Sequence, residues 1–236
     1  MKKLFPYLVI VFLAGVIASS GQAQQMMLGV RGGINNVIDI NSLPFESLTS
    51  HTCIFAGGQV DYQFNTMWAL SLQALYYQKA AHGTGYANAY TGYRGYADWT
   101  MTYLEIPLVG KVNFGHSIIR PYIFAGPSFG VLLSSIEKVH TGGGSGIPNG
   151  LGNTSHNDGI KNDTTINLTN SITKIEYSIL VGAGISVFFA SGFQLFVDAG
   201  YAFSATNIDN YPWDKAYSTY EYPLDLRLAT GVLFPI

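Results

Sequence analysis

Hydrophobic and polar residues alternate with a period of two in eight segments of the chain, as in β-strands that present one face to an apolar environment. To within a few residues at each end, the segments span 27–35, 53–64, 68–79, 99–114, 118–132, 175–188, 193–202 and 224–234. The connectors alternate between long and short. The short ones are 65–67, 115–117 and 190–192, and the long, polar ones are 36–52, 80–98, 133–174 and 203–223. Short periplasmic turns and long outer loops are typical of outer-membrane barrels, so this order predicts an all-β, eight-stranded antiparallel up-and-down transmembrane barrel.

Charged residues test this prediction, because a charge that faces lipid near the membrane midplane costs about 2 to 4 kcal/mol. One phase of each segment is apolar, as in Leu104, Ile106 and Leu108. All ten charged residues of the segments fall on the other phase: Arg31, Asp61, Lys79, Glu105, Lys111, Arg120, Glu176, Asp198, Asp225 and Arg227. In the fifth segment Arg120 shares its phase with Tyr122 and Phe124, so the two faces could be exchanged near its ends. The charge-free phase is predicted to face lipid.

The charged phase is then predicted to fill the lumen. Glu105 and Lys111 on one segment and Asp225 and Arg227 on another could form an ion-pair network with the charges of the other segments, which are Arg31, Asp61, Arg120, Glu176 and Asp198. Eight strands enclose a space just wide enough for side chains. We therefore interpret the network as structural and prefer this reading to a transport path.

The first 23 residues have the features of a secretory signal peptide. Lys2 and Lys3 form a basic start, residues 4–17 are an apolar stretch too short to span a membrane comfortably, and residues 21–23 offer small side chains for cleavage. We expect cleavage before Gln24, which leaves residues 24–236 as one barrel domain. This predicts export through the periplasm to the outer membrane of a Gram-negative cell.

Composition excludes some functions. The chain has 236 residues, 27 Gly, 16 Tyr and only 11% charged residues, which suits a single β domain. Its formal net charge of −2 falls by two, to −4, without Lys2 and Lys3, so there is no basic footprint for nucleic acid. Cys53 has no cysteine partner in the chain and is interpreted as a small residue of the second strand.

No catalytic, cofactor or metal site is predicted. The histidines fall in predicted outer loops or, for His116, in a turn, and they lack a metal-binding spacing; the loop histidines are His51, His82, His140 and His156. A hydrolytic site would need Ser134 or Ser135 to act with His140, which sequence alone does not support. The glycine-rich stretch 141–146 lacks the Lys-Ser/Thr ending of a phosphate loop, and the Asn and Asp residues at 157–159 and 162–163 miss the calcium-loop spacing.

Two adjacent segments are distinctive in sequence. They are Tyr103 to Val112, with the sequence YLEIPLVGKV, and Arg120 to Gly130, with the sequence RPYIFAGPSFG. Together with the later VGAGI at 181–185 and DAGY at 198–201, they resemble the PorT-like outer-membrane β-barrel family common in Bacteroidota. The resemblance covers nearly the whole mature chain and implies an eight-stranded barrel. It implies little about activity, although the family's name derives from a member linked to protein secretion.

These features favour a non-enzymatic outer-membrane barrel with a side-chain-filled lumen. We expect contact with outer-membrane lipid and a structural or partner-binding role through the outer loops, chiefly 133–174, with a protein of the envelope or of a secretion system as the partner. The alternatives are a narrow or gated channel for small solutes and, less favoured, a lipid-modifying enzyme at the rim. A soluble lipocalin-like binder is disfavoured because its outer face should carry charges.

Overall fold

The computed structural model of the chain describes residues 25–37, 47–87, 94–141, 162–170, 173–206 and 224–236. Its strands are β1 (Gln25–Val37), β2 (Ser47–Gln63), β3 (Trp68–Ala87), β4 (Arg94–Asn113), β5 (Ile119–Thr141), β6 (Asn162–Asn167), β7 (Ile175–Phe188), β8 (Gln194–Ser204) and β9 (Leu224–Pro235). In these ranges no helix is long and apolar enough to cross a membrane. The predicted signal peptide lies outside the described residues.

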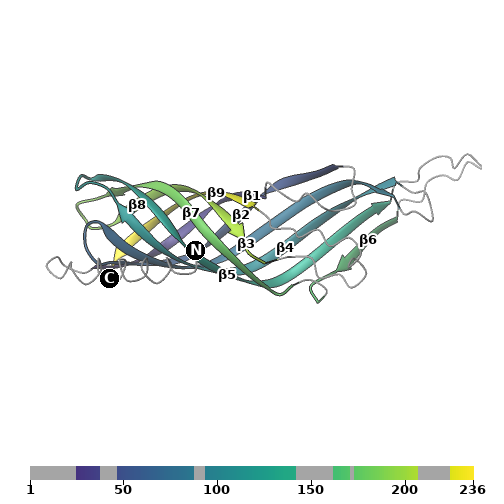
Figure 1. Cartoon of the computed structure of the whole chain (residues 1–236), viewed down its shortest axis with the longest axis horizontal. Coiled ribbons are helices and arrows are strands. Elements are labelled where there is room, and N and C mark those ends of the chain that lie inside the picture. Colours follow the sequence, from purple (N-terminus) through teal and green to yellow (C-terminus); the bar gives the residue numbers. More distant parts are fainter. Residues whose placement is uncertain (1–24, 38–46, 88–93, 142–161, 171–172, 207–223) are drawn as a thin grey trace, which may run out of the picture.

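Eight of the strands form a closed antiparallel barrel. Strands β1 to β5 and β7 to β9 each pair with their neighbours in the chain, and β1 pairs with β9 from Met27 opposite Pro235 to Val37 opposite Asp225. β5 pairs directly with β7, and among the described strands β6 pairs only with the outer end of β5. Figure 1 shows the tilted strands wrapped into one barrel. The predicted eight-stranded fold is confirmed.

The three predicted short connectors are tight turns at one end of the barrel. Gly115 and Gly192 have φ angles of 83° and 89°, which glycine adopts at no steric cost. In the first turn, the Asn65 side-chain oxygen accepts hydrogen bonds from the backbone N–H groups of Met67 and Trp68 at 2.8 and 2.7 Å. The strand ends that border the predicted long connections therefore lie at the opposite, outer end.

The assignment of the two faces is also confirmed. The predicted lipid phase is exposed, as at Val30, which is 60% exposed, whereas Asp61 on the opposite phase of the neighbouring strand is 2% exposed. In β5, Ile123 is 50% exposed and Phe124 only 6%, so this strand keeps the orientation that its apolar phase predicted. The ring of Phe124 lies against Gly182 on β7, where an added Cβ would come within 2.4 Å of the ring. Glycine on the neighbouring strand makes room for a large aromatic side chain in the lumen.

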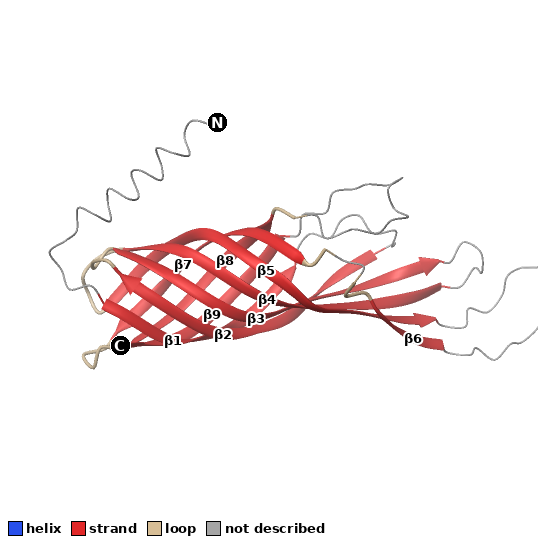
Figure 2. Cartoon of the chain, turned by 90° about the horizontal axis from the view of Figure 1, so that it is seen from below, coloured by secondary structure: helices blue, strands red, loops and turns tan. Residues whose placement is uncertain are grey.

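Strand lengths differ from the prediction. Strands β2 to β5 continue well beyond the barrel into the predicted outer loops, and β6 adds a further strand at the edge of β5. Figure 2 shows this sheet projecting past the other strands. We call the part formed by 47–52, 80–87, 94–102, 134–141 and β6 the outer extension. The sequence prediction ended these strands where their apolar alternation ends. That alternation is required only where a strand faces lipid, whereas the hydrogen bonds between strands continue into water.

Candidate functional site

The lumen holds a first group of charges toward the turn end. Arg31 donates from Nη2 to Asp198 Oδ1 at 2.9 Å, and Lys111 Nζ donates to Asp61 Oδ2 at 2.7 Å. Tyr122 donates its hydroxyl to the other oxygen of Asp198 at 2.8 Å. The Gln59 side chain links the two pairs, accepting from Arg31 at 3.3 Å and donating to Asp61 at 2.8 Å. Two cations and two carboxylates therefore form one connected network.

A second group lies nearer the outer ends of the strands. Lys79 Nζ is 2.6 Å from Glu176 Oε1 and 3.4 Å from Asp225 Oδ2. Arg227 is 3.0 Å from Glu105 Oε1 and 3.7 Å from Asp225 Oδ2, so Asp225 joins the two cations. Further hydrogen bonds come from the Tyr77 hydroxyl to Asp225 at 2.7 Å and from Ser128 to Glu105. All five charged side chains are buried, and such charges are tolerated only when paired.

Aromatic rings stack against these cations. The Arg227 guanidinium lies 4.4 Å from the centre of the Tyr77 ring, and Arg31 and Lys111 both lie 5.5 Å from the centre of the Phe196 ring. Cation–π contacts of this kind are worth about 2 kcal/mol or more when they are desolvated. Two apolar clusters accompany the two charged groups, one around Phe196 and one around Tyr77. Buried rings therefore pack beside the ion pairs in both charged groups.

Arg120 is the one predicted network residue that lies elsewhere. Its Nε donates to the carbonyl oxygen of Ser117 at 3.0 Å, and its guanidinium lies 4.1 Å from the centre of the Phe188 ring. The reason is position, because Arg120 is the second residue of β5, directly after a turn. The described lumen network therefore has four cations and five carboxylates, because Arg120 lies outside it.

A small cavity remains in the second group. It is lined by Tyr77, Lys79, Tyr103, Glu105, Gly130, Glu176, Ser178 and Arg227. The room for water centres within it is about 10 Å³, which is about what a single water molecule needs. At this level a hydrated ion would have to displace the charged side chains.

The candidate hydrolytic residues do not form a site. Ser134 and His140 lie six residues apart on β5, a separation of about 20 Å along a strand. Ser135 is fully buried, and its backbone N–H donates to the Thr169 hydroxyl. The glycine-rich residues 142–146, the Asn and Asp residues 157–159 and His156 lie outside the described residues. Within the described part of the chain, these serines and His140 give no nucleophile and base in contact.

Three histidines that sequence analysis treated as separate loop residues come together on the outer extension. His51, His82 and His140 lie on β2, β3 and β5, and Asp98 on β4 lies between the latter two. Linear spacing gave no signal for this cluster, because its members come from four strands. Only the pairing register of the four strands shows that these residues lie close together.

Comparison with known proteins gives a family match and distant structural similarities. Residues 22–210 match the profile of the outer membrane protein beta-barrel domain. OprG from Pseudomonas aeruginosa is 12% identical, with a TM-score of 0.45, over 90% of this chain and 96% of that one. Neisserial surface protein A is 13% identical, with a TM-score of 0.44, over 91% and 100%. Ail of Yersinia pestis, solved in complex with the heparin analogue sucrose octasulfate, is 12% identical, with a TM-score of 0.40, over 90% and 99%. No curated protein sequence matches.

Proposed function

Because the chain belongs to the outer membrane protein beta-barrel domain family, we propose that it is a non-enzymatic envelope protein that binds a protein partner through the outer extension. The protein is an outer-membrane β-barrel, and its exposed apolar face contacts lipid. Within this setting the lumen serves as a filled, rigid support, and recognition takes place on the sheet above it.

The observation that carries the proposal is that, among the described strands, two edges of the extension have no pairing partner. No described strand pairs with the second edge of β6. At the other side, pairing of β1 with β2 ends at Asn36 opposite Thr52, so residues 47–51 of β2 pair only with β3 among the described strands. A free edge offers backbone N–H and C=O groups to an incoming strand, which is a common mode of peptide recognition. The extension is thus suited to accept an extended segment of a partner.

The filled lumen supports a binding role over conduction. Breaking a buried ion pair costs about 3 to 5 kcal/mol, so an open path through both charged groups would be expensive. We also propose that the chain is a PorT-like member of the family. This rests on Glu105-Ile106-Pro107 in β4 and Arg120-Pro121-Tyr122 in the adjacent β5. The partner is then expected among envelope proteins of a secretion system, and residues 1–23 are proposed to be the signal peptide removed on export.

Site-specific crosslinking in intact cells tests this proposal. A photoreactive residue in place of Ile166 on β6 should capture a defined partner, whereas the same residue in place of His116 in a periplasmic turn should not. Thr165→Lys should weaken capture, because an edge lysine opposes strand addition. Thr100→Lys, on a face of the extension rather than at an edge, is the matched control.

Conductance provides the second measurement. The purified barrel in a planar bilayer should pass no steady current. Steady current, together with capture that Thr165→Lys leaves unchanged, would replace the binding proposal with the narrow-channel one.

A further inference from the structure

A cluster of imidazole and carboxylate groups lies on the outer extension. His82 and Asp98 are directly opposite each other on β3 and β4, and His82 Nδ1 is 2.6 Å from Asp98 Oδ1. On the other side of Asp98, His140 Nε2 is 3.6 Å from Oδ2. A ligand atom of His51 lies within 4.8 Å of those of His82 and Asp98. Three imidazoles thus surround one carboxylate, which gives four potential ligands.

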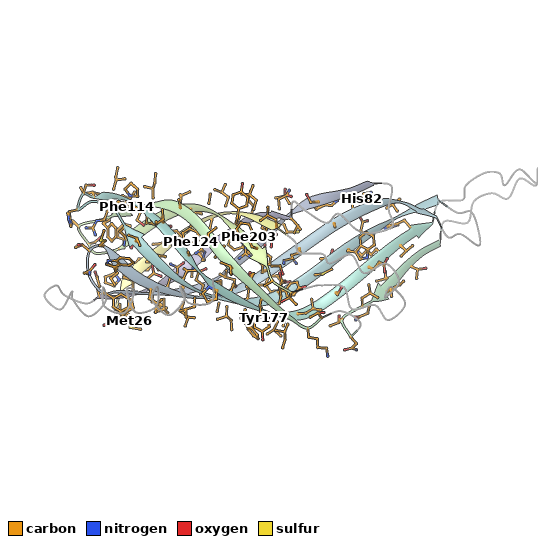
Figure 3. All side chains as sticks on the ribbon, in the orientation of Figure 1. Met26, His82, Phe114, Phe124, Tyr177 and Phe203 are labelled. Atoms are coloured by element: carbon orange, nitrogen blue, oxygen red, sulfur yellow. The ribbon has the colours of Figure 1, made fainter. Side chains whose placement is uncertain are left out.

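The strand register explains why these side chains meet. His82 lies opposite Asp98, and His140 lies opposite Tyr96, two residues before Asp98 on β4. His51 lies opposite Ala80, two residues before His82 on β3. Side chains two residues apart on a strand share a face. Figure 3 shows His82 on the projecting sheet, at the other end of the molecule from Met26 and Phe114.

Tyr96 forms an aromatic wall beside the cluster. Its ring stacks on that of His140, with centres 4.5 Å apart and planes 19° apart, and lies 5.2 Å from the ring of His82. These contacts restrict both imidazoles, while the side chains of His82 and His140 remain about a quarter exposed, at 27% and 25%. The group is therefore ordered and still open to an ion from the medium.

We propose that His51, His82, Asp98 and His140 form a binding site for a divalent transition-metal ion, with Zn²⁺ as the best fit. Imidazole nitrogen and carboxylate oxygen are zinc ligands, and four of them complete a tetrahedral shell. Calcium and magnesium prefer shells of oxygen alone, so three imidazoles disfavour them. The single carboxylate charge offsets part of the charge of the ion.

The ligand atoms of His51, His82 and Asp98 already lie within 4.8 Å of one another, whereas His140 faces the other oxygen of Asp98 and has to turn toward the ion. Bonds of about 2.0 to 2.1 Å place tetrahedral ligand atoms about 3.3 Å apart. The separation of 3.6 Å between His140 and Asp98 is close to that value, and His51 has to approach by no more than about 1.5 Å, which rotation of an exposed side chain provides. Binding would replace the hydrogen bond between His82 and Asp98 with bonds to the metal.

Metal titration of the mature barrel tests the proposal. The protein should carry no histidine tag, and Zn²⁺ should be measured against a chromophoric chelator in detergent. We expect one tight ion per barrel. His82→Ala and Asp98→Ala should each weaken binding by at least about tenfold. His116→Ala is the matched control, since it removes a histidine from a turn at the other end, and it should leave the affinity unchanged.

Two further measurements keep the result interpretable. Heat-modifiable gel migration shows whether each variant still forms the barrel. Substitutions in the outer extension should leave barrel formation unchanged. X-ray absorption at the zinc edge should show imidazole scattering from three histidines in the loaded protein. If zinc binds the triple variant His51→Ala/His82→Ala/His140→Ala as tightly as the parent, or if the parent binds no zinc, the cluster is only a hydrogen-bonded group around Asp98 and the proposal is wrong.

Discussion

Removing the carboxylate of Asp198 should strongly destabilise the barrel. Asp198 accepts hydrogen bonds from Arg31 at 2.9 Å and from Tyr122 at 2.8 Å, and it is 4% exposed. In Asp198→Ala the Arg31 guanidinium stays buried and keeps the 3.3 Å hydrogen bond to Gln59 and the contact with the Phe196 ring, but no carboxylate partner. A buried charge left without its partner costs about 3 to 5 kcal/mol. The lost hydrogen bond from the Tyr122 hydroxyl accounts for about 1 kcal/mol of this destabilisation.

The double variant Arg31→Met/Asp198→Ala separates the pair from the burial of either side chain. With the cation also removed, no uncompensated charge remains, and methionine keeps much of the volume against the Phe196 ring. Replacing a buried ion pair with apolar side chains is often close to neutral. The double variant should therefore be more stable than Asp198→Ala alone by about 2 to 3 kcal/mol.

Urea unfolding of the barrel in lipid vesicles measures both effects, with the folded fraction read from gel migration. A change in midpoint at constant slope reports the change in free energy. Arg120→Met is the control, because this arginine contacts Phe188 and a turn carbonyl rather than the network, and it should cost no more than about 1 kcal/mol. The reasoning fails if Asp198→Ala costs no more than this control, or if the double variant is the least stable of the three.

Two further predictions concern the membrane boundary and the extension. Leu108→Lys should destabilise the inserted barrel by about 2 to 4 kcal/mol in the same urea assay. Thr100→Lys, on the same face of β4 but above the apolar band, should change the stability little. Equal effects would contradict the placement of the membrane boundary between these two residues. The pKa of the Glu137 carboxyl is raised, because the effect of burial outweighs the opposite effect of the hydrogen bond with Trp99. Because the folded pKa lies above the unfolded one, Glu137 stabilises the extension at low pH and this contribution is lost as pH rises through the folded pKa. Glu137→Gln should therefore slow hydrogen exchange of the outer part of β5 at neutral pH and have no such effect in acid.

Sequence was sufficient for the barrel because lipid imposes a strict rule on each strand. Val30, Ile123 and Leu108 could be placed outside, and Asp61 and Asp198 inside, from period two and the cost of a charge in lipid. For β5 the sequence left an exchange of the two faces open near the strand ends, and the burial of Tyr122 and Phe124 decides the assignment. Arg120 itself escapes the rule, since at the end of a strand it reaches the interface without entering the lumen.

The outer extension was not predictable from the same signal. Beyond the membrane both faces of a strand meet water, so Ser134, Lys138 and His140 give no apolar alternation. The metal-ligand cluster needs more information still. It depends on the β3 and β4 hairpin register that sets His82 opposite Asp98, and on the irregularity between His51 and Phe55 that shifts β2 against β3. One misjudged residue of register would move His51 to the other face of the sheet.

Height above the membrane decides whether the extension can bind ions or partners from the medium. Leu104 is the last aliphatic residue on the lipid face of β4, and Asp98 follows six residues further out. Six residues rise about 20 Å along a strand, or about 15 Å above Leu104 at a tilt near 40°. Polar headgroups add only about 5 to 8 Å on each side of the hydrocarbon core. Because β3 and β4 run unbroken from the filled lumen to this height, the barrel holds the histidine cluster in water, clear of the headgroups, where zinc has free access to it.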